Sequence, residues 1–466
     1  MKNSNKNPGP AAAGLAFLIS YGFFQVLYPY YLMRREQMSL FMYDGDYISQ
    51  TYRGVGWLSR FLSDFLCQFY HLPVLGPFIA AIVVTAIGVV AYKISRRFLG
   101  RWVSLFIAAA FFSWTLIRET DYLFTTRYAV AVLGLLSLVL AAVQFKKKWA
   151  IPVAAVFFLA FGVWAFGSPV HKYYGVVWAK PALDYERIIG MDVEAARENW
   201  DKVLKLSEKD LNAQEETYYH NLAKAMKGNM GEGLCQYTQG GVNGLFFLWS
   251  VGQADEFRTC MSGEVWYHLG DMTQAEQSVI TSLQASPNHT GARYLKRLAQ
   301  INLISGEYGA AGKYLTMLSK TLNYRKWARR MMAEDLDDEA DAWLKNARAK
   351  LADRDFIYYT TDLRPILRCM LEANPDNHLA QQYLLCYDIL CFDLDAFVED
   401  NSVYKLTDDS YQEASIIWLS HSDERTEDGV FEKFGISEDT VDRFKRFLKN
   451  PDWYKGTYFY HYLTAN

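Results

Sequence analysis

Five long stretches without a charged side chain occupy the first third of the 466-residue chain and restrict its fold more than any other feature. A helix needs roughly 17 to 25 apolar residues to cross a hydrocarbon core of about 30 Å. One such run could be a buried core helix, but five in succession favour a membrane protein. The sequence therefore predicts membrane-spanning helices at residues 11–33, 72–92, 102–117, 128–145 and 149–170.

The charges between these stretches predict an orientation. Nine basic residues and no acidic residue flank the stretches on the side of the N-terminus, whereas the opposite loops, 34–71 and 118–127, carry six basic and six acidic residues. Basic residues near span ends stay in the cytoplasm. We therefore expect a multi-pass protein of the cytoplasmic (inner) membrane with a cytoplasmic N-terminus and, after five spans, a periplasmic or otherwise extracytoplasmic C-terminal region.

The rest of the chain differs sharply in composition. Residues 1–171 contain 15 Lys and Arg against 6 Asp and Glu, and residues 172–466 contain 33 against 45. This acidic balance argues against nucleic acid as a partner, because such binding relies on Lys and Arg neutralising phosphates. The sequence predicts a transmembrane domain over 1–171, a short connector over 172–183 and a water-soluble domain over 184–466.

The first outer loop has two notable parts. Aromatic and leucine side chains at helical spacing predict an amphipathic helix in the membrane interface at about residues 55–70. Before it, Asp44 and Asp46 flank a glycine. This arrangement resembles the first external loop of polytopic glycosyltransferases that use lipid-linked sugars, which implies an acid, base or metal-binding role for Asp44 or Asp46. A solvated Asp-Gly-Asp turn is the alternative.

A helical repeat accounts for most of the remaining chain. A glycine followed five residues later by a small residue recurs four times, with glycines 38, 42 and 36 residues apart. A glycine can end one helix in the left-handed conformation, and a small residue lets the returning helix approach closely. Antiparallel helix pairs of this kind stack into an α-solenoid. The four pairs are Gly190 and Ala195, Gly228 and Gly233, Gly270 and Ala275, and Gly306 and Ala311.

The third repeat resembles the tetratricopeptide (TPR) family in more detail. Gly263, Trp266, Gly270, Ala275 and Pro287 fall on the spacing of that motif. The resemblance implies an all-α fold in which a bundle of about five transmembrane helices precedes a tetratricopeptide-like solenoid. Solenoids of this family offer extended grooves for peptides and proteins.

No motif for catalysis, metal or cofactor binding accompanies these features. The chain lacks phosphate-binding, zinc-protease and nucleophile-elbow signatures, and its eight histidines show no ligand spacing. The architecture, with the stretches FLSDFLCQFYHLPVLGPF (61–78) and KGNMGEGL (227–234), resembles a family of bacterial polytopic membrane proteins without known activity. We expect no cofactor and no bound metal.

Two hypotheses remain. The first is a membrane-anchored scaffold whose helical-repeat domain binds a protein or peptide partner outside the cytoplasm, with the lipid bilayer around its spans. The second is a membrane enzyme or assembly factor that acts on lipid-linked glycans through Asp44 or Asp46. The sequence favours the scaffold, and with it a protein that is not an enzyme, over the enzyme alternative.

Overall fold

The computed structural model describes residues 9–54, 56–120, 126–144, 152, 156, 183–208, 211–247, 255–286, 289–351, 362–423 and 429–465. These residues form helices, turns and short connections, and no strand occurs among them. The predicted all-α fold is therefore confirmed at this level. Two compact units are present: unit 1 comprises Met1–Ile189, Gly291–Arg293 and Thr316–Ala328, and unit 2 comprises Gly190–Thr290, Tyr294–Leu315 and Arg329–Asn466.

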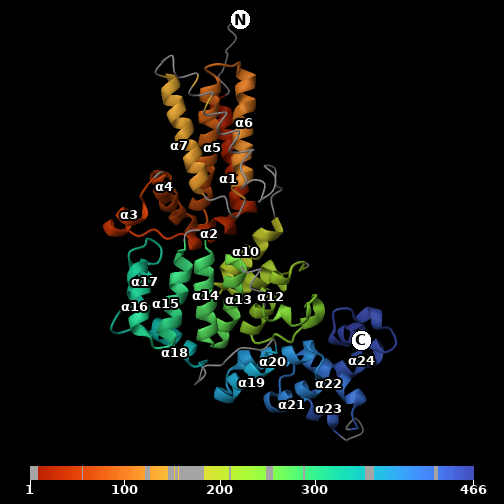
Figure 1. The fold of residues 1–466 in the computed structure, drawn as a ribbon. Helices are drawn as coiled ribbons and strands as arrows, with labels where there is room; N and C mark the ends of the chain where they lie inside the picture. Colours follow the sequence, from red (N-terminus) through yellow and green to blue (C-terminus); the bar gives the residue numbers. More distant parts are fainter. Residues whose placement is uncertain are drawn as a thin grey trace. The chain divides into compact units, whose positions relative to one another are not determined.

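Unit 1 is built on four long apolar helices, which Figure 1 shows side by side. Shorter helices, one of them amphipathic, lie between the first and the second of these along the chain. The helices of residues 9–144 are α1 (Gly9–Gly22), the π-helix η1 (Phe23–Leu27), α2 (Pro29–Met38), α3 (Gly45–Thr51), α4 (Trp57–Cys67), the 3₁₀ helix η2 (Gln68–His71), α5 (Leu75–Ser95), α6 (Arg101–Arg118) and α7 (Thr126–Gln144).

Helix α5 is the centre of this unit, with α1, α6 and α7 packed around it. Ile87 of α5 and Leu136 of α7 are completely buried. A Cβ atom on Gly88 would lie 3.3 Å from Cβ of Phe112, so this glycine lets α5 and α6 approach closely, as small residues do between membrane helices. The outer surfaces are apolar, because Leu18 and Leu138 are 65% and 69% exposed.

Three of the helices in the described part of the chain are long and apolar enough to cross a membrane: Gly9–Leu27, Leu75–Ser95 and Thr126–Gln144. The prediction of five spans is therefore too high for the described residues. The third predicted span, 102–117, forms α6, but Arg101 and Arg118 lie within this helix and lower its mean hydropathy. The fifth, 149–170, falls almost entirely outside the described residues.

The first predicted span is also too long at its C-terminal end. The apolar helix stops at Leu27, and α2 begins at Pro29 after a break at Tyr28. Proline cannot donate to the preceding turn, but it suits the first position of a new helix. Tyr31 and Met33, which the prediction places in the membrane helix, are buried residues of α2.

The helix expected at about 55–70 is present as α4 followed by η2. Its apolar residues Trp57, Leu58 and Leu62 are 49%, 52% and 38% exposed, whereas Gln68 in η2 is buried. The hydroxyl of Tyr52 donates to the Asp64 carboxylate at 3.0 Å. The polar face of this segment is thus directed inward and part of its apolar face outward.

Unit 2 consists of short helices, many of which begin at a side-chain cap. Asp255, Asp271, Asp337, Asn377 and Asp393 each accept a hydrogen bond from a backbone N–H in the first turn of the following helix. The helices of residues 183–331 are α10 (Leu183–Ala195), α11 (Trp200–Leu206), α12 (Gln214–Met226), η3 (Leu234–Gln236), η4 (Gly241–Gly244), α13 (Glu256–Leu269), α14 (Met272–Ala285), α15 (Ala292–Ile304), α16 (Tyr308–Ser319) and α17 (Arg325–Met331). They continue with α18 (Asp338–Arg348), α19 (Arg364–Ala373), α20 (His378–Leu390), α21 (Leu394–Tyr404), α22 (Asp409–His421), α23 (Val430–Lys433), α24 (Glu438–Phe447), η6 (Pro451–Tyr454) and α25 (Tyr458–Ala465).

The best-formed hairpin of unit 2 joins α13 to α14, and α20 packs against both α12 and α13. Except for Arg258, no residue of α13 is exposed. The carboxylate of Glu264 in α13 accepts from Arg297 of α15 at 2.6 Å, and both side chains are buried. Helix α13 is therefore an internal element of unit 2 and leaves little surface for a partner.

Candidate functional site

The two carboxylates that the sequence singles out lie at the start of α3. Asp44 is the N-cap of this helix and accepts from the backbone N–H of Tyr47 at 2.9 Å. Lys320 Nζ lies 2.6 Å from the other carboxylate oxygen. The lysine, together with the Tyr47 N–H, holds the pKa of Asp44 below its ordinary value, which makes this carboxylate a weaker base.

Asp46 lies in the first turn of the same helix and is exposed. Asp44 is partly exposed, and no group of three or more His, Cys, Asp or Glu side chains suited to a metal occurs among the described residues. The Asp44–Asp46 pair therefore has the features of a capped turn.

A buried polar helix follows the first apolar helix directly. Arg34, Arg35, Glu36 and Gln37 of α2 are all buried. The guanidinium of Arg35 pairs with the Glu119 carboxylate and also donates to the Glu119 carbonyl oxygen at 3.0 Å. A buried charge pair survives only when further hydrogen bonds satisfy it, and this second bond meets that requirement.

Glu186 caps the beginning of α2. Its carboxylate accepts from the N–H groups of Tyr30, at 2.6 Å, and Tyr31, at 3.0 Å. Free N–H groups at a helix N-terminus favour a carboxylate. Burial nevertheless raises the pKa of Glu186 to about 8, and the two backbone hydrogen bonds oppose this rise. The contact links residues that are 156 positions apart in the chain.

Glu36 is the centre of a second polar cluster in unit 1. Its carboxylate accepts from Asn323 Nδ2 at 2.9 Å and from the Tyr324 hydroxyl at 3.1 Å. The Nδ1 atom of His71 lies 3.3 Å away. Asn323 Nδ2 also donates to the carbonyl oxygen of Gln68 at 2.8 Å, so one amide connects α2 with η2.

Backbone contacts extend this cluster along the first loop. The Tyr43 N–H donates to the Lys320 carbonyl oxygen at 2.8 Å, and the Ala292 N–H donates to the Ser39 carbonyl oxygen at 3.1 Å. Arg293 donates to the Gln37 side chain at 3.3 Å. Residues 291–293 and 316–328, which the sequence analysis assigns to the soluble domain, are thus bound to the first loop inside unit 1.

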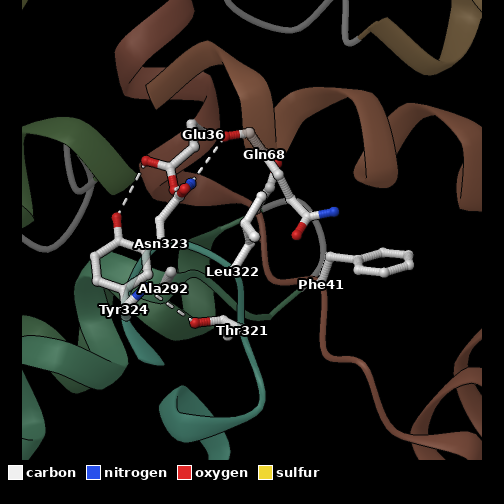
Figure 2. A pocket seen from close by; sticks show the side chains of 9 residues that line it. Glu36, Phe41, Gln68, Ala292, Thr321, Leu322, Asn323 and Tyr324 are labelled. Atoms are coloured by element: carbon white, nitrogen blue, oxygen red, sulfur yellow. Dashed lines mark hydrogen bonds between the residues drawn. The ribbon is translucent and has the colours of Figure 1, made fainter. Parts of the chain in front are cut away.

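A small pocket opens beside Glu36 (Figure 2). It has room for about one water molecule. The pocket combines a carboxylate and two side-chain amides with two aromatic rings. Its lining residues are Glu36, Ser39, Phe41, Gln68, Ala292, Thr321, Leu322, Asn323 and Tyr324.

The sequence alone does not predict this site. Glu36 and Asn323 are 287 residues apart, so no local pattern relates them. The one local signal was the polar run Arg34–Gln37 at the end of an apolar stretch, which resembles the charged flank of any membrane helix.

The third and fourth glycine–small pairs of the repeat lie where one helix ends and the next returns, whereas the first two pairs do not. Gly270 ends α13 in the left-handed conformation, with φ of 99°, and Ala275 is buried in α14. Gly306 has φ of 82° between α15 and α16, and Ala311 is buried. Pro287 lies outside the described residues.

The first two repeats differ from the expected hairpin. Gly190 and Ala195 both lie inside α10, and the chain turns later, at Glu198 and Asn199. Gly190 therefore ends no helix. Gly228 follows α12 with φ of 83°, but the chain then passes through Gly233 into a 3₁₀ turn and not into a returning helix.

Gly263 and Trp266 lie on α13. A Cβ atom on Gly263 would lie 2.7 Å from Cβ of Ser278, so the close approach of α13 and α14 depends on this glycine. Trp266 is buried against Phe246, with ring centroids 5.0 Å apart. Both residues serve the packing of unit 2.

Comparison with known proteins identifies a family but no activity. No curated protein and no solved structure matches the chain. One family model, described as a family of unknown function (DUF6057), matches residues 6–180 and 170–465 and so accounts for nearly the whole sequence. The protein therefore belongs to the DUF6057 family.

Proposed function

We propose that the protein is a membrane-anchored helical scaffold whose C-terminal region binds a protein or peptide partner outside the cytoplasm. Three apolar helices with exposed leucines provide the anchor. The exposed apolar side of α4 suits the outer membrane interface, where Trp57 would lie among the headgroups. The placement in the cytoplasmic membrane and the orientation rest on the basic residues flanking the apolar stretches.

The observation that carries the scaffold proposal is the composition of unit 1. It contains the apolar helices and also the start of α15 and the end of α16, joined to the first loop by the hydrogen bonds of Ala292, Lys320 and Asn323. The start of α15 and the segment that follows α16 are therefore parts of the unit that contains the apolar helices. A chain in which the anchor and the helical repeats share such segments suits a scaffold that works at the membrane.

The hairpins α13–α14 and α15–α16 carry the tetratricopeptide-like signature, which supports a binding role of the solenoid type. A groove on α13 itself is not available, since nearly all of its residues are buried. We place the partner site on the outer helices of these hairpins, where Ile280 of α14 is 39% exposed and Tyr308 of α16 is 59% exposed.

The alternative, an enzyme acting on lipid-linked glycans, receives little support from the first loop. A general base or metal ligand there would need an accessible carboxylate, and the Asp44 carboxylate is held by Lys320 and by the start of α3. Asp46 lacks a neighbouring His, Cys, Asp or Glu group suited to a metal within the described residues.

Orientation can be tested with the chain's own cysteines. Cys391 is exposed, whereas Cys67, Cys260 and Cys386 are buried. A membrane-impermeant maleimide should label Cys391 from outside intact spheroplasts, and Cys391→Ser should lose that label. A cysteine introduced at exposed Arg97, between α5 and α6, should react only after permeabilisation. The opposite labelling pattern would refute the orientation.

Partner binding is tested by photocrosslinking in the native membrane. A photoreactive residue at Ile280 or Tyr308 should capture one defined protein, and the same residue at Arg97 should not capture it. In the reciprocal experiment, the captured protein is immobilised and should bind the full chain. If neither outer position gives a protein adduct above the Arg97 background, the scaffold proposal is wrong.

A further inference from the structure

Two acceptors in the Glu36 pocket are buried without a full set of partners. The Glu36 side chain is 5% exposed, and its partners are the neutral groups of Asn323 and Tyr324 together with His71. Among the described residues, no Lys or Arg forms an ion pair with Glu36. His71, whose Nδ1 lies 3.3 Å from the Glu36 carboxylate, is a cation only when it is protonated. Beside a neutral His71 the buried carboxylate carries a desolvation cost, which a bound cation would offset.

The second acceptor is the side chain of Gln68, which is 7% exposed. Its Nε2 atom donates to the Phe65 carbonyl oxygen at 3.2 Å, but its Oε1 atom has no hydrogen-bond partner in the described part of the chain. Figure 2 shows this amide directed between Leu322 and Phe41 at the pocket. A buried acceptor left unpaired favours any ligand that brings a donor.

We propose that this pocket binds a primary ammonium group, supplied by the ethanolamine headgroup of a membrane phospholipid. The ammonium donates to the Glu36 carboxylate, and Gln68 Oε1 is available to a further donor or to a water beside it. The source of the ammonium rests on the proposed function, because only a membrane-spanning chain holds the pocket at the level of the headgroups.

The size of the pocket, its charge and its hydrogen-bond acceptors all favour a primary ammonium group. The pocket has room for about one water molecule, which is close to the size of an ammonium group. The Glu36 carboxylate selects a cation and rejects phosphate or carboxylate groups. Three N–H donors suit a pocket that presents acceptors, whereas a quaternary ammonium has none to offer. The rings of Phe41 and Tyr324 in the lining also tolerate a cation.

The position in the chain favours a lipid as the source. Gln68 and His71 belong to η2, and the candidate membrane span α5 begins four residues after His71, at Leu75. Between them, Leu72 and Val74 are 49% and 64% exposed. Exposed apolar residues at a span end lie where the hydrocarbon core meets the headgroups. In the proposed anchor, where α5 crosses the bilayer, this end of α5 and the pocket beside it lie near the level of the headgroups.

The first test measures thermal unfolding of the detergent-solubilised full chain with added ethanolamine. Ethanolamine should raise the unfolding midpoint of the wild type, and choline, which has the same charge but no N–H, should not. In Glu36→Gln the apparent affinity for ethanolamine should fall at least about tenfold, the loss expected for a charge-assisted hydrogen bond. Gln68→Leu, which keeps the carboxylate, should weaken binding less.

Asp44→Asn is the matched control, because it removes a carboxylate of the same unit that does not line the pocket. It should retain the wild-type response to ethanolamine. Equal stabilisation by ethanolamine and choline, or an unchanged response in both Glu36→Gln and Gln68→Leu, would overturn the proposal. The comparison of ethanolamine with choline on the wild type requires no variant, so it decides the matter even if Glu36→Gln fails to fold.

The second test identifies the source. Native mass spectrometry of the chain from nanodiscs containing equal phosphatidylethanolamine and phosphatidylcholine should show retained phosphatidylethanolamine, and Glu36→Gln should lose it. If soluble ethanolamine binds but no lipid is retained, the lipid source is wrong and a polypeptide amine is the remaining candidate. Extraction of the chain by alkaline carbonate without detergent would contradict the membrane anchor itself, independently of the ethanolamine result.

Discussion

Replacing Gly263 by alanine tests the close packing of α13 on α14 directly. The added Cβ would lie 2.7 Å from Cβ of Ser278 and 3.7 Å from the Ala275 carbonyl oxygen. Carbon atoms in contact prefer about 3.5 to 4.0 Å, so the two helices must separate by roughly 1 Å. Overpacking of this kind costs about 1 to 3 kcal/mol.

The helix preference of alanine acts in the opposite direction. Alanine in place of a helical glycine stabilises by roughly 0.5 to 1 kcal/mol. Gly309 of α16 gives the matched control, since a Cβ there would meet no atom within 4 Å. Gly309→Ala should therefore be slightly stabilising, and the difference between the two variants isolates the packing cost of about 1 to 3 kcal/mol at Gly263.

The assay is thermal or denaturant unfolding of the detergent-solubilised chain, followed by tryptophan fluorescence, because Trp266 lies one turn from Gly263 on α13. Gly263→Ala should lower the midpoint by a few degrees relative to Gly309→Ala. Adding Ser278→Gly should recover most of the packing loss, which a double-mutant cycle measures. Equal midpoints for the two alanine variants would refute the close approach of these helices.

Three further outcomes are expected. Glu264→Gln should destabilise unit 2 by about 3 to 5 kcal/mol, since it removes the negative charge that pairs with buried Arg297. Glu264→Leu with Arg297→Met should cost far less, and denaturant midpoints compare the two variants. Gly270→Ala should also destabilise, because φ is 99° and the added Cβ would meet the Lys350 carbonyl oxygen; Gly309→Ala is again the control. The pKa of Glu186 is raised to about 8 in the folded chain from 4.5 in the unfolded chain, so the stability that this group provides is complete below about pH 4.5 and is lost as the pH rises through 8, by at most about 5 kcal/mol. The free energy of unfolding, measured over a pH series, should therefore fall with rising pH more in the wild type than in Glu186→Gln. An identical pH dependence of the two proteins would contradict this prediction.

Local chemistry explains which parts of the fold could be predicted from the sequence. Long apolar runs form helices wherever they occur, so α5 and α7 lie within a few residues of the predicted spans. Gly270 and Gly306 were predictable as helix ends because their left-handed conformation is a local requirement. At Gly190 the same pattern failed, since helix α10 continues through the glycine and a turn three residues after Ala195 reverses the chain.

The Glu36 site could not be predicted because it depends on contacts between distant segments. Its polar residues look like the ordinary flank of a membrane helix until Asn323 and Tyr324 meet them. Asp44 depends on a distant segment in the same way: the sequence presents an acidic turn, and the partner of its carboxylate is Lys320, 276 residues away. In both cases the decisive partner comes from the segment 316–328, which the sequence pattern assigns to another domain.

The burial of α2 also changes the physical basis of the orientation argument. The count of charges at the two ends of the apolar helices treats every charged residue as exposed to headgroups. The structure buries Arg34, Arg35 and Glu36 at one end, where Arg35 is paired with Glu119, whereas Lys93, Arg96 and Arg97 at the other end are exposed. Charges held within the protein interact weakly with the membrane surface potential, so the exposed basic cluster between α5 and α6 is the stronger determinant. Among the described residues, the proposed orientation with a cytoplasmic N-terminus therefore rests mainly on Lys93, Arg96 and Arg97.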